Sequence, residues 1–213
     1  MGKQIMIIGC GPGAPELMTI KGKKAIENAD AVIGSKRLIK DFVKKNASLK
    51  TLILENNYNE ILDRAAQFYE QNKKLVFLVS GDPLFYSFGK SVLDKFGKDN
   101  CEVIPGISSV QFAFSRLKES WKEYRTFTLH GTDDVEIQKI FNENNKFVLL
   151  LDPKNNLKMI KSKLTLNSAS KYKFCIVSNL SLSNQRILDI SFEDLDKVEE
   201  ESLSMLIVTR ISD

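Results

Sequence analysis

Residues 4–16 read QIMIIGCGPGAPE, an apolar run that ends in a loop of glycines and prolines. An uninterrupted apolar run of this length predicts a buried strand from Gln4 to Gly9. The glycines that follow let the backbone come close to another group, while the prolines hold the turn in shape. In an open sheet of parallel strands, ligands bind beyond the carboxyl ends of the strands. This loop is therefore the first place to expect a ligand.

Further short apolar runs alternate with helical periodicity through the first half of the chain. Two helical faces stand out, one with Ile61, Leu62, Ala65, Phe68 and Tyr69 and another with Phe85, Phe88, Val92 and Phe96. This alternation predicts βα units wound into a mainly parallel sheet. The expected strands are Gln4–Gly9, Ala31–Gly34, Thr51–Leu54, Leu75–Ser80 and Glu102–Ile104.

The second half shows a different pattern, typical of a mixed sheet. The chain becomes polar around Glu119–Arg125, which predicts two α/β domains, residues 1–118 and 119–213. Helices are expected to begin at Asp134 as an N-cap and at Pro153 as a first-turn proline. The last two strands are expected to pair as antiparallel neighbours across the acidic stretch Glu193–Glu201. The expected strands are Thr126–His130, Lys146–Leu151, Lys173–Ser178, Arg186–Ile190 and Leu203–Arg210.

Composition limits the possible functions. Of the 213 residues 43% are apolar, enough for a large core, and 31 basic against 27 acidic side chains give a net charge of +4. The lysines are scattered, which argues against nucleic-acid binding. A mild positive excess suits a substrate with several carboxylates, and it equally suits a surface that is simply soluble.

The cysteines argue against a metal site. Cys10, Cys101 and Cys175 lie in or beside apolar runs, form no C-x-x-C pair, and accompany a single histidine, His130. We expect buried free thiols, which fit a reducing cytoplasm. The sequence also lacks a membrane-spanning apolar run and the pattern of a signal peptide. These features predict a cytoplasmic protein without a protein-bound metal.

Three predicted strand ends carry unusual loops: the first loop, the run Ser80-Gly81-Asp82-Pro83, and the run Pro105-Gly106-Ile107-Ser108-Ser109. Each has an ordinary explanation. A tight βα turn explains the first, a simple turn the second, and Ser108 with Gln111 has the spacing of a capping box. The three together at one sheet edge favour a ligand site.

The first loop fits a dinucleotide-binding fingerprint only loosely. Gly9, Gly11 and Ala14 satisfy its spacing, but Pro12 and Pro15 remove N–H donors that a pyrophosphate would need. No acidic residue ends the second strand. A ligand without phosphates therefore fits better. The sequence also lacks a P-loop and a nucleophile elbow, and His130 either faces the ligand or is structural.

The three loops, in this order and spacing, resemble the tetrapyrrole methylase family. Gly9–Gly13 with Pro15-Glu16-Leu17 and Thr19 matches its first motif, and the other two loops match its second and third. The runs Gly81–Ser87 and Pro105–Gln111, with Trp121 and Leu129-His130-Gly131, are similar to the cobalt-precorrin-7 C(5)-methyltransferase branch. The resemblance extends from about Ile5 to about Ile207.

This resemblance implies an S-adenosylmethionine-dependent enzyme that methylates carbon 5 of cobalt-precorrin-7 in anaerobic cobalamin biosynthesis. It implies a homodimer whose two α/β domains hold the cofactor in a cleft between them. His130 is the candidate for substrate orientation or proton removal. The residues expected to bind the cofactor are Gly11, Pro12, Gly13, Gly81, Asp82, Pro83, Ser108 and Ser109, with Leu151 and Leu180 from the second domain.

Three departures from the family pattern leave the exact corrin intermediate open: Ala14, Thr132 and Ser178. The alternatives are a methylase of the same fold that acts on another precorrin, on diphthamide or on ribosomal RNA, or a non-catalytic cofactor-binding or tetrapyrrole-binding protein. Fused relatives carry a second methyltransferase domain. Methylation at C(15) and decarboxylation are therefore expected from a separate partner enzyme.

Overall fold

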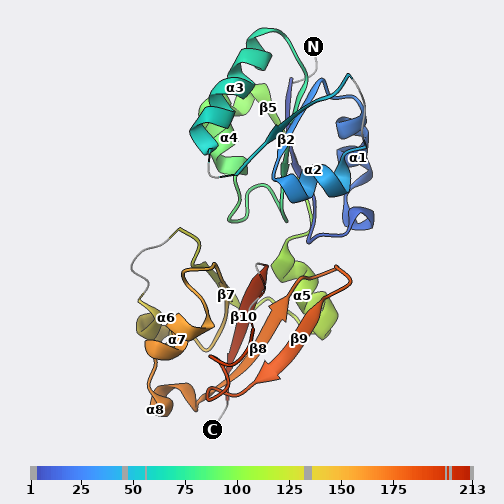
Figure 1. The fold of residues 1–213 in the computed structure, drawn as a ribbon. Helices are drawn as coiled ribbons and strands as arrows, with labels where there is room; N and C mark the ends of the chain where they lie inside the picture. Colours follow the sequence, from blue (N-terminus) through green and yellow to red (C-terminus); the bar gives the residue numbers. More distant parts are fainter. Residues whose placement is uncertain are drawn as a thin grey trace. The chain divides into compact units, whose positions relative to one another are not determined.

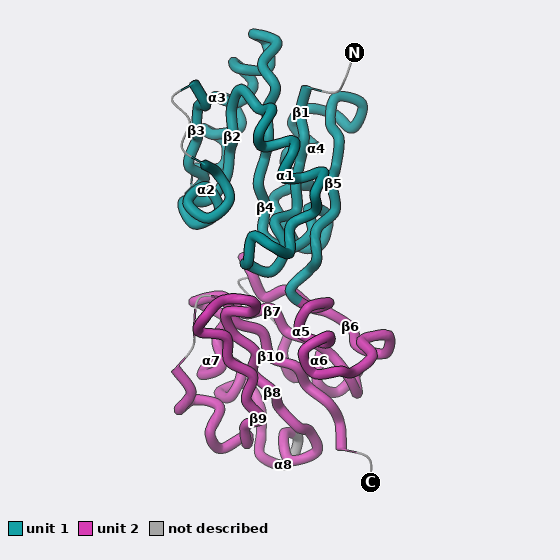
Figure 2. The backbone as a smooth tube through the Cα atoms, turned by 90° about the vertical axis from the view of Figure 1, so that its right-hand side faces the viewer, with its two compact units in different colours: residues 1–109 teal, residues 110–213 magenta. Residues whose placement is uncertain are grey.

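The computed structural model describes residues 4–44, 48–55, 57–131, 136–199, 201 and 203–211. The chain forms two compact units, residues 1–109 and 110–213 (Figure 2). The boundary between the units falls between Ser109 and Val110, at the first residue of helix α5 (Ser109–Leu117), whereas the sequence predicts a boundary after residue 118. The ring of Phe114 in α5 lies 4.5 Å from that of Tyr124, which connects this helix to the second unit. Thr132 and Asp134 lie outside the described residues.

The first unit is a fully parallel sheet with strand order β3-β2-β4-β1-β5, as the alternating pattern predicted. Helices α1 and α2 cover one face and α3 and α4 the other (Figure 1). The five expected strands are confirmed to within one residue at every end. The elements are β1 (Ile5–Gly9), α1 (Ile20–Glu27), β2 (Ala31–Gly34), α2 (Lys36–Phe42), β3 (Lys50–Ile53), α3 (Tyr58–Glu70), β4 (Leu75–Val79), α4 (Gly89–Phe96) and β5 (Cys101–Ile104), with short 3-10 turns at Pro15–Leu17 and Lys98–Asn100.

One helical face was predicted too long. The face of α3 is confirmed, but α4 begins at Gly89, so Phe85 precedes the helix. The side chain of Asp82 accepts the N–H of Leu84 and its carbonyl accepts that of Phe85, which forms a turn here instead. A Cβ on Gly89 would lie 2.2 Å from the carbonyl oxygen of Pro83, so the helix can start only with glycine at this contact.

The second unit contains a mixed sheet with strand order β6-β7-β10-β8-β9. Strands β6 and β7 are parallel, and β10 runs antiparallel to both of its neighbours. Helices α6, α7 and α8 supply apolar residues to the core on one face. The elements are α5, β6 (Arg125–Thr128), α6 (Ile137–Glu143), β7 (Lys146–Leu150), α7 (Leu157–Ser162), α8 (Leu166–Ala169), β8 (Tyr172–Ser178), β9 (Arg186–Ile190) and β10 (Ser204–Arg210).

The expected pairing of the last two strands is wrong. Strand β9 pairs with β8 alone, and β10 inserts between β7 and β8. Burial explains the order: residues 204–208 of β10 are all buried, as a central strand requires, whereas β9 is partly exposed along its length. The thirteen-residue connection 191–203 is long enough to carry the chain to the centre of the sheet.

The helix expected at Pro153 begins later, at Leu157, with Asn156 as its N-cap. The carboxylate of Asp152 accepts the N–H groups of Lys154 (2.8 Å) and Asn155 (2.6 Å) and so forms a turn where the helix was expected. Among the residues that the structure describes, no helix is long and apolar enough to cross a membrane.

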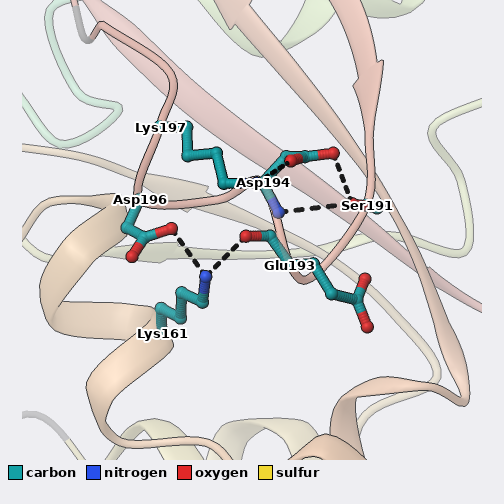
Figure 3. A network of polar contacts seen from close by, with 6 residues as sticks. All are labelled: Lys161, Ser191, Glu193, Asp194, Asp196 and Lys197. Carbon is teal, nitrogen blue, oxygen red and sulfur yellow. Dashed lines mark hydrogen bonds and ion pairs between the residues drawn. The ribbon is translucent and has the colours of Figure 1, made fainter.

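A polar network fastens the turn after β9 to helix α7 (Figure 3). Lys161 of α7 donates to the carbonyl of Glu193 and to Asp196, both at 2.6 Å. Asp194 accepts from Ser191 at 2.7 Å and from Lys197 at 2.8 Å. The turn buries Leu195 completely in the core of the second unit. The network therefore holds an apolar anchor in place.

We expect this network to make the stability of the chain depend on pH. The hydrogen bond from Lys197 lowers the pKa of Asp194, and the one from Lys161 lowers the pKa of Asp196. A lowered folded-state pKa stabilises above the unfolded value, near about 3.9, and the effect is lost as pH falls through the folded pKa. The urea midpoint of the double variant Asp194→Asn, Asp196→Asn should lie below that of the wild type at pH 6. The two should converge at roughly pH 2. Equal midpoints at pH 6 would contradict the prediction.

Candidate functional site

The three loops singled out in the sequence meet at one edge of the first sheet. They follow β1, β4 and β5, and β1 lies between the other two strands. Because all three strands are parallel, their carboxyl ends lie at the same edge. The loops are thus brought together by the strand order, which the sequence did not reveal.

Glycines allow the three loops to touch through their backbones. A Cβ on Gly106 would lie 2.3 Å from the carbonyl oxygen of Gly81 and 2.7 Å from the carbonyl carbon of Gly9. A Cβ on Gly9 would lie 2.5 Å from the same Gly81 oxygen. Real side chains are excluded at such distances, so only glycine permits this contact.

The first and second loops are also joined by hydrogen bonds. Gly11 and Gly81 form an antiparallel bridge in which the N–H of Gly81 donates to Gly11 at 2.9 Å and the reverse bond is 3.3 Å. Both glycines have positive φ angles, 75° and 64°. This conformation favours glycine and explains its presence at both positions.

Asp82 ties the second loop to the third. Its Oδ2 accepts the N–H of Gly106 at 3.2 Å, while its Oδ1 accepts the N–H of Leu84 at 2.9 Å. Both carboxylate oxygens therefore accept hydrogen bonds from the backbone of the loops. Gly81 lies beside the third loop, since its Cβ would be 3.6 Å from the Cα of Ser108 and 3.8 Å from the nitrogen of Ser109.

The remaining expected contacts of this unit lie on the same loops. Pro12, Gly13 and Pro83 are buried, and Ser108 is 6% exposed at the start of α5. A hollow of about 550 Å³ between α1 and α2 lies elsewhere, and none of the expected site residues lines it.

The edge fits a ligand without phosphates better than a dinucleotide. A pyrophosphate site needs a helix N-terminus directly after the first strand. Here β1 ends at Gly9 and α1 begins only at Ile20, where Thr19 Oγ1 caps the helix by accepting the N–H of Gly22 at 3.1 Å. The loops instead present glycines and buried prolines, which suit an apolar or flat ligand.

In the second unit, Leu151 and Leu180 lie at one edge of the mixed sheet. The N–H of Leu151 donates to the backbone carbonyl of Ser204 at 3.1 Å, and the hydroxyl oxygens of Ser178 and Ser204 are 2.8 Å apart. The start of β10 therefore joins the ends of β7 and β8. Both leucines are buried, and Leu151 also lines a hollow of about 470 Å³ with Asp152 and Asn156.

His130 lies at the same edge, after β6. It is exposed, and its Nδ1 lies 3.3 Å from Thr128 Oγ1. Asp152 accepts the N–H of Gly131 at 3.2 Å, and the side chain of Asn155 donates to the carbonyl of Leu129 at 2.8 Å. The Leu129–Gly131 turn is thus held on both sides of the histidine.

The pKa of Asp152 reflects this role. Burial acts to raise the pKa of the carboxyl, but the backbone N–H groups of Asn155, Gly131 and Lys154 outweigh it, and the pKa is lowered. The group is therefore a carboxylate at neutral pH, as an acceptor of several N–H donors must be.

Two polar side chains at these edges were missed by the sequence. Asn179, with φ 50° and 4% exposure, precedes Leu180, and Arg37 follows β2. Each has a buried nitrogen, Nδ2 and Nη1 respectively, without a hydrogen-bond partner among the described residues. Neither belongs to a recognisable motif, so no local pattern distinguished them from structural residues.

The three cysteines are free thiols. Cys10 and Cys101 are buried as expected, whereas Cys175 is only partly buried. Burial raises the pKa of Cys10 to about 12 despite the opposing charge of Arg37, so the thiol is not a nucleophile at neutral pH. Within the described part of the chain, no cluster of three or more His, Cys, Asp or Glu side chains is arranged to hold a metal ion.

Comparison with known proteins identifies the family. The model of the tetrapyrrole (corrin/porphyrin) methylases matches residues 4–196. A probable cobalt-precorrin-7 C(5)-methyltransferase of Methanocaldococcus jannaschii is 35% identical over 96% of this chain and 95% of its own length. The cobalt-precorrin-4 C(11)-methyltransferase of the same organism is 42% identical, over 54% of this chain and 47% of its own.

A solved structure agrees in fold. The uroporphyrin-III C-methyltransferase of Thermus thermophilus, complexed with S-adenyl homocysteine, superposes with a TM-score of 0.77 at 18% identity and covers 97% of each chain. With its parallel first sheet, mixed second sheet and three glycine-rich loops at one sheet edge, this chain belongs to the tetrapyrrole methylase family.

Proposed function

We propose that this chain transfers the methyl group of S-adenosylmethionine to carbon 5 of cobalt-precorrin-7 in cobalamin biosynthesis. The observation that carries the proposal is the similarity to the Methanocaldococcus jannaschii enzyme, which spans nearly the whole of both chains. The three joined loops support it, because they form a backbone-lined edge suited to a cofactor without phosphates.

The cofactor contacts that we propose are those expected from the sequence. In the first unit they are Gly11, Pro12, Gly13, Gly81, Asp82, Pro83, Ser108 and Ser109, and in the second Leu151 and Leu180. Bound S-adenosylmethionine supplies an electrophilic methyl group on a sulfonium. The carboxylate of Asp82 then has a positioning role, since it fixes the third loop through Gly106.

The chain's own task is positioning. Rigid loops that hold two reactants at near-attack distance can supply roughly 7 to 11 kcal/mol of a barrier. The mutual contact of Gly9, Gly81 and Gly106 provides such rigidity. No strong base is required, because an electron-rich macrocycle can attack before it loses a proton.

We propose that His130 orients the substrate or removes that proton. The exposed imidazole is held by Thr128 and by the fastened Leu129–Gly131 turn, which supports the role. His130→Ala is expected to lower kcat by about tenfold and to leave S-adenosylmethionine affinity within about twofold. Steady-state kinetics and calorimetry measure the two quantities. Unchanged kcat would remove His130 from the mechanism.

A second candidate is methylation at another corrin carbon. It is favoured by the 42% identity to the cobalt-precorrin-4 C(11)-methyltransferase, although that similarity covers only about half of each chain. Incubation with labelled S-adenosylmethionine and each of the two cobalt-precorrins separates the candidates. Label at carbon 5, located by NMR, supports our proposal. Label at carbon 11 supports the alternative, and binding without transfer of label would indicate a non-catalytic protein.

We further propose that the chain works as a homodimer in the reducing cytoplasm, which would keep its three free thiols reduced. Sedimentation of the purified protein tests the oligomeric state. A separate enzyme for C(15) methylation and decarboxylation stays a prediction.

A further inference from the structure

Arg37 brings a positive charge to the edge that carries the three loops. It is the second residue of α2, which follows β2 after the capping residue Ser35. Strand β2 lies beside β4, so Arg37 reaches the loop that follows β4. Its Nη2 donates to Ser80 Oγ at 2.9 Å. Ser80 directly precedes Gly81 and Asp82.

The other arm of the guanidinium is unsatisfied. Nη1 is buried and has no hydrogen-bond partner among the described residues. A buried donor without a partner destabilises a protein, more so when it is charged, and most such groups in native structures are paired. An unpaired arm at a ligand edge therefore indicates that a ligand supplies the acceptor.

The residue as a whole remains within reach of a ligand. Arg37 is only half-buried and its partner Ser80 is exposed. The positive charge of Arg37 also acts on Cys10 in the first loop. Burial raises the pKa of the Cys10 thiol, while the charge of Arg37 acts in the opposite direction. The guanidinium thus lies close to two of the three loops.

Carboxylate is the acceptor that suits this group best. The planar fork of a guanidinium matches the two oxygens of a carboxylate and is positively charged at any ordinary pH. Ser80 occupies one arm and keeps the fork oriented. Neutral acceptors would leave the charge uncompensated.

We propose that Arg37 is a carboxylate-binding residue of this site. The inference rests on the proposed function, under which two ligands carry carboxylates. One is the tetrapyrrole, through its acetate and propionate side chains, and the other is the amino-acid end of S-adenosylmethionine. The chemistry is the same in both cases.

The test compares Arg37→Gln with the wild type on two matched pairs of probes. The first pair is cobyrinic acid and its fully methyl-esterified form, in one mixed solvent. The second is S-adenosylmethionine and its decarboxylated analogue. For one acid probe we expect Arg37→Gln to weaken binding by roughly 10- to 100-fold, the effect of losing a hydrogen bond to a charged group. The matched probe without the carboxylate should bind the variant and the wild type within about twofold. The affected pair identifies the source of the carboxylate.

Two further variants separate binding from structure. Arg64→Gln removes an exposed arginine of α3 that forms a surface ion pair with Glu60, and it should leave all four affinities unchanged. Ser80→Ala removes the anchor of one arm but keeps the charge, so it should weaken the same acid probe by only about threefold.

Equal weakening of both members of each pair by Arg37→Gln would show a purely structural role and overturn the proposal. So would no weakening of either acid probe. The wild-type transfer of label to the cobalt-precorrin is measured separately. If the wild type transfers label and Arg37→Gln gives either of these results, only the role of Arg37 is refuted. If the wild type transfers no label and binds none of the probes, the proposed function is refuted as well.

Discussion

Gly106→Ala is expected to lower the free energy of unfolding by about 3 kcal/mol and to abolish measurable binding of S-adenosylmethionine. The new Cβ would lie 2.3 Å from the carbonyl oxygen of Gly81 and 2.8 Å from the Cα of Gly9. These atoms are backbone, held by β1 and β4, so they cannot swing aside as a flexible side chain can. Relief requires the three loops to move apart, which also disrupts the proposed cofactor contacts.

Gly131→Ala is the matched control for this prediction. Gly131 has a φ of 68°, but among the residues that the structure describes a Cβ there would meet no atom within 4 Å outside the adjoining residues. It should therefore show only backbone strain, about 1 kcal/mol. Urea unfolding followed by circular dichroism gives both values, and calorimetry gives the affinity of Gly106→Ala. A Gly106→Ala protein as stable as Gly131→Ala would refute the close packing of the loops.

Asp82→Ala is expected to raise the Kd for S-adenosylmethionine by about 30-fold and to lower the free energy of unfolding by about 2 kcal/mol. The carboxylate accepts the N–H groups of Leu84 and Gly106, and alanine leaves both donors without this acceptor. The third loop, with Ser108 and Ser109, then loses its tie to the second. Calorimetric titration of each variant measures the change.

Two further variants serve as controls for the effect of Asp82→Ala. Asp82→Asn keeps one acceptor oxygen and should recover part of the affinity, because the amide can still receive one N–H. Asp94→Ala removes an exposed carboxylate of α4 that forms a surface ion pair with Lys90, and its effect on either quantity should be small. If Asp82→Ala bound the cofactor as tightly as Asp94→Ala, the carboxylate would have no part in the site.

Local patterns predicted most of the secondary structure. The ten expected strands are present because each is a short apolar run bounded by turn residues, a signal that needs only neighbours in sequence. The errors arose where a distant or side-chain contact decides the outcome. The close approach of Pro83 leaves room only for glycine at position 89, where α4 begins, and Asp152 forms a turn where Pro153 suggested a helix.

Some residues of the candidate site could be predicted from local sequence patterns, and others could not. The glycines, the prolines and Asp82 were recognisable because loop residues after strands form motifs along the chain. The buried nitrogens of Arg37 and Asn179 that lack a partner within the described part of the chain were not recognisable, because an unsatisfied donor is defined by what lies around it in space.

The sequence by itself determined the strands, the three loops and the family, since each depends on residue type at short spacing. Only the tertiary structure decided the strand orders. Residues 204–208 of β10 are all buried, and a buried strand needs hydrogen-bond partners for its backbone on both edges, which β7 and β8 supply at the centre of the second sheet. Likewise β1 lies between β4 and β5, and this order alone brings Gly9, Gly81 and Gly106 into contact, because it requires close approach of segments far apart in the chain.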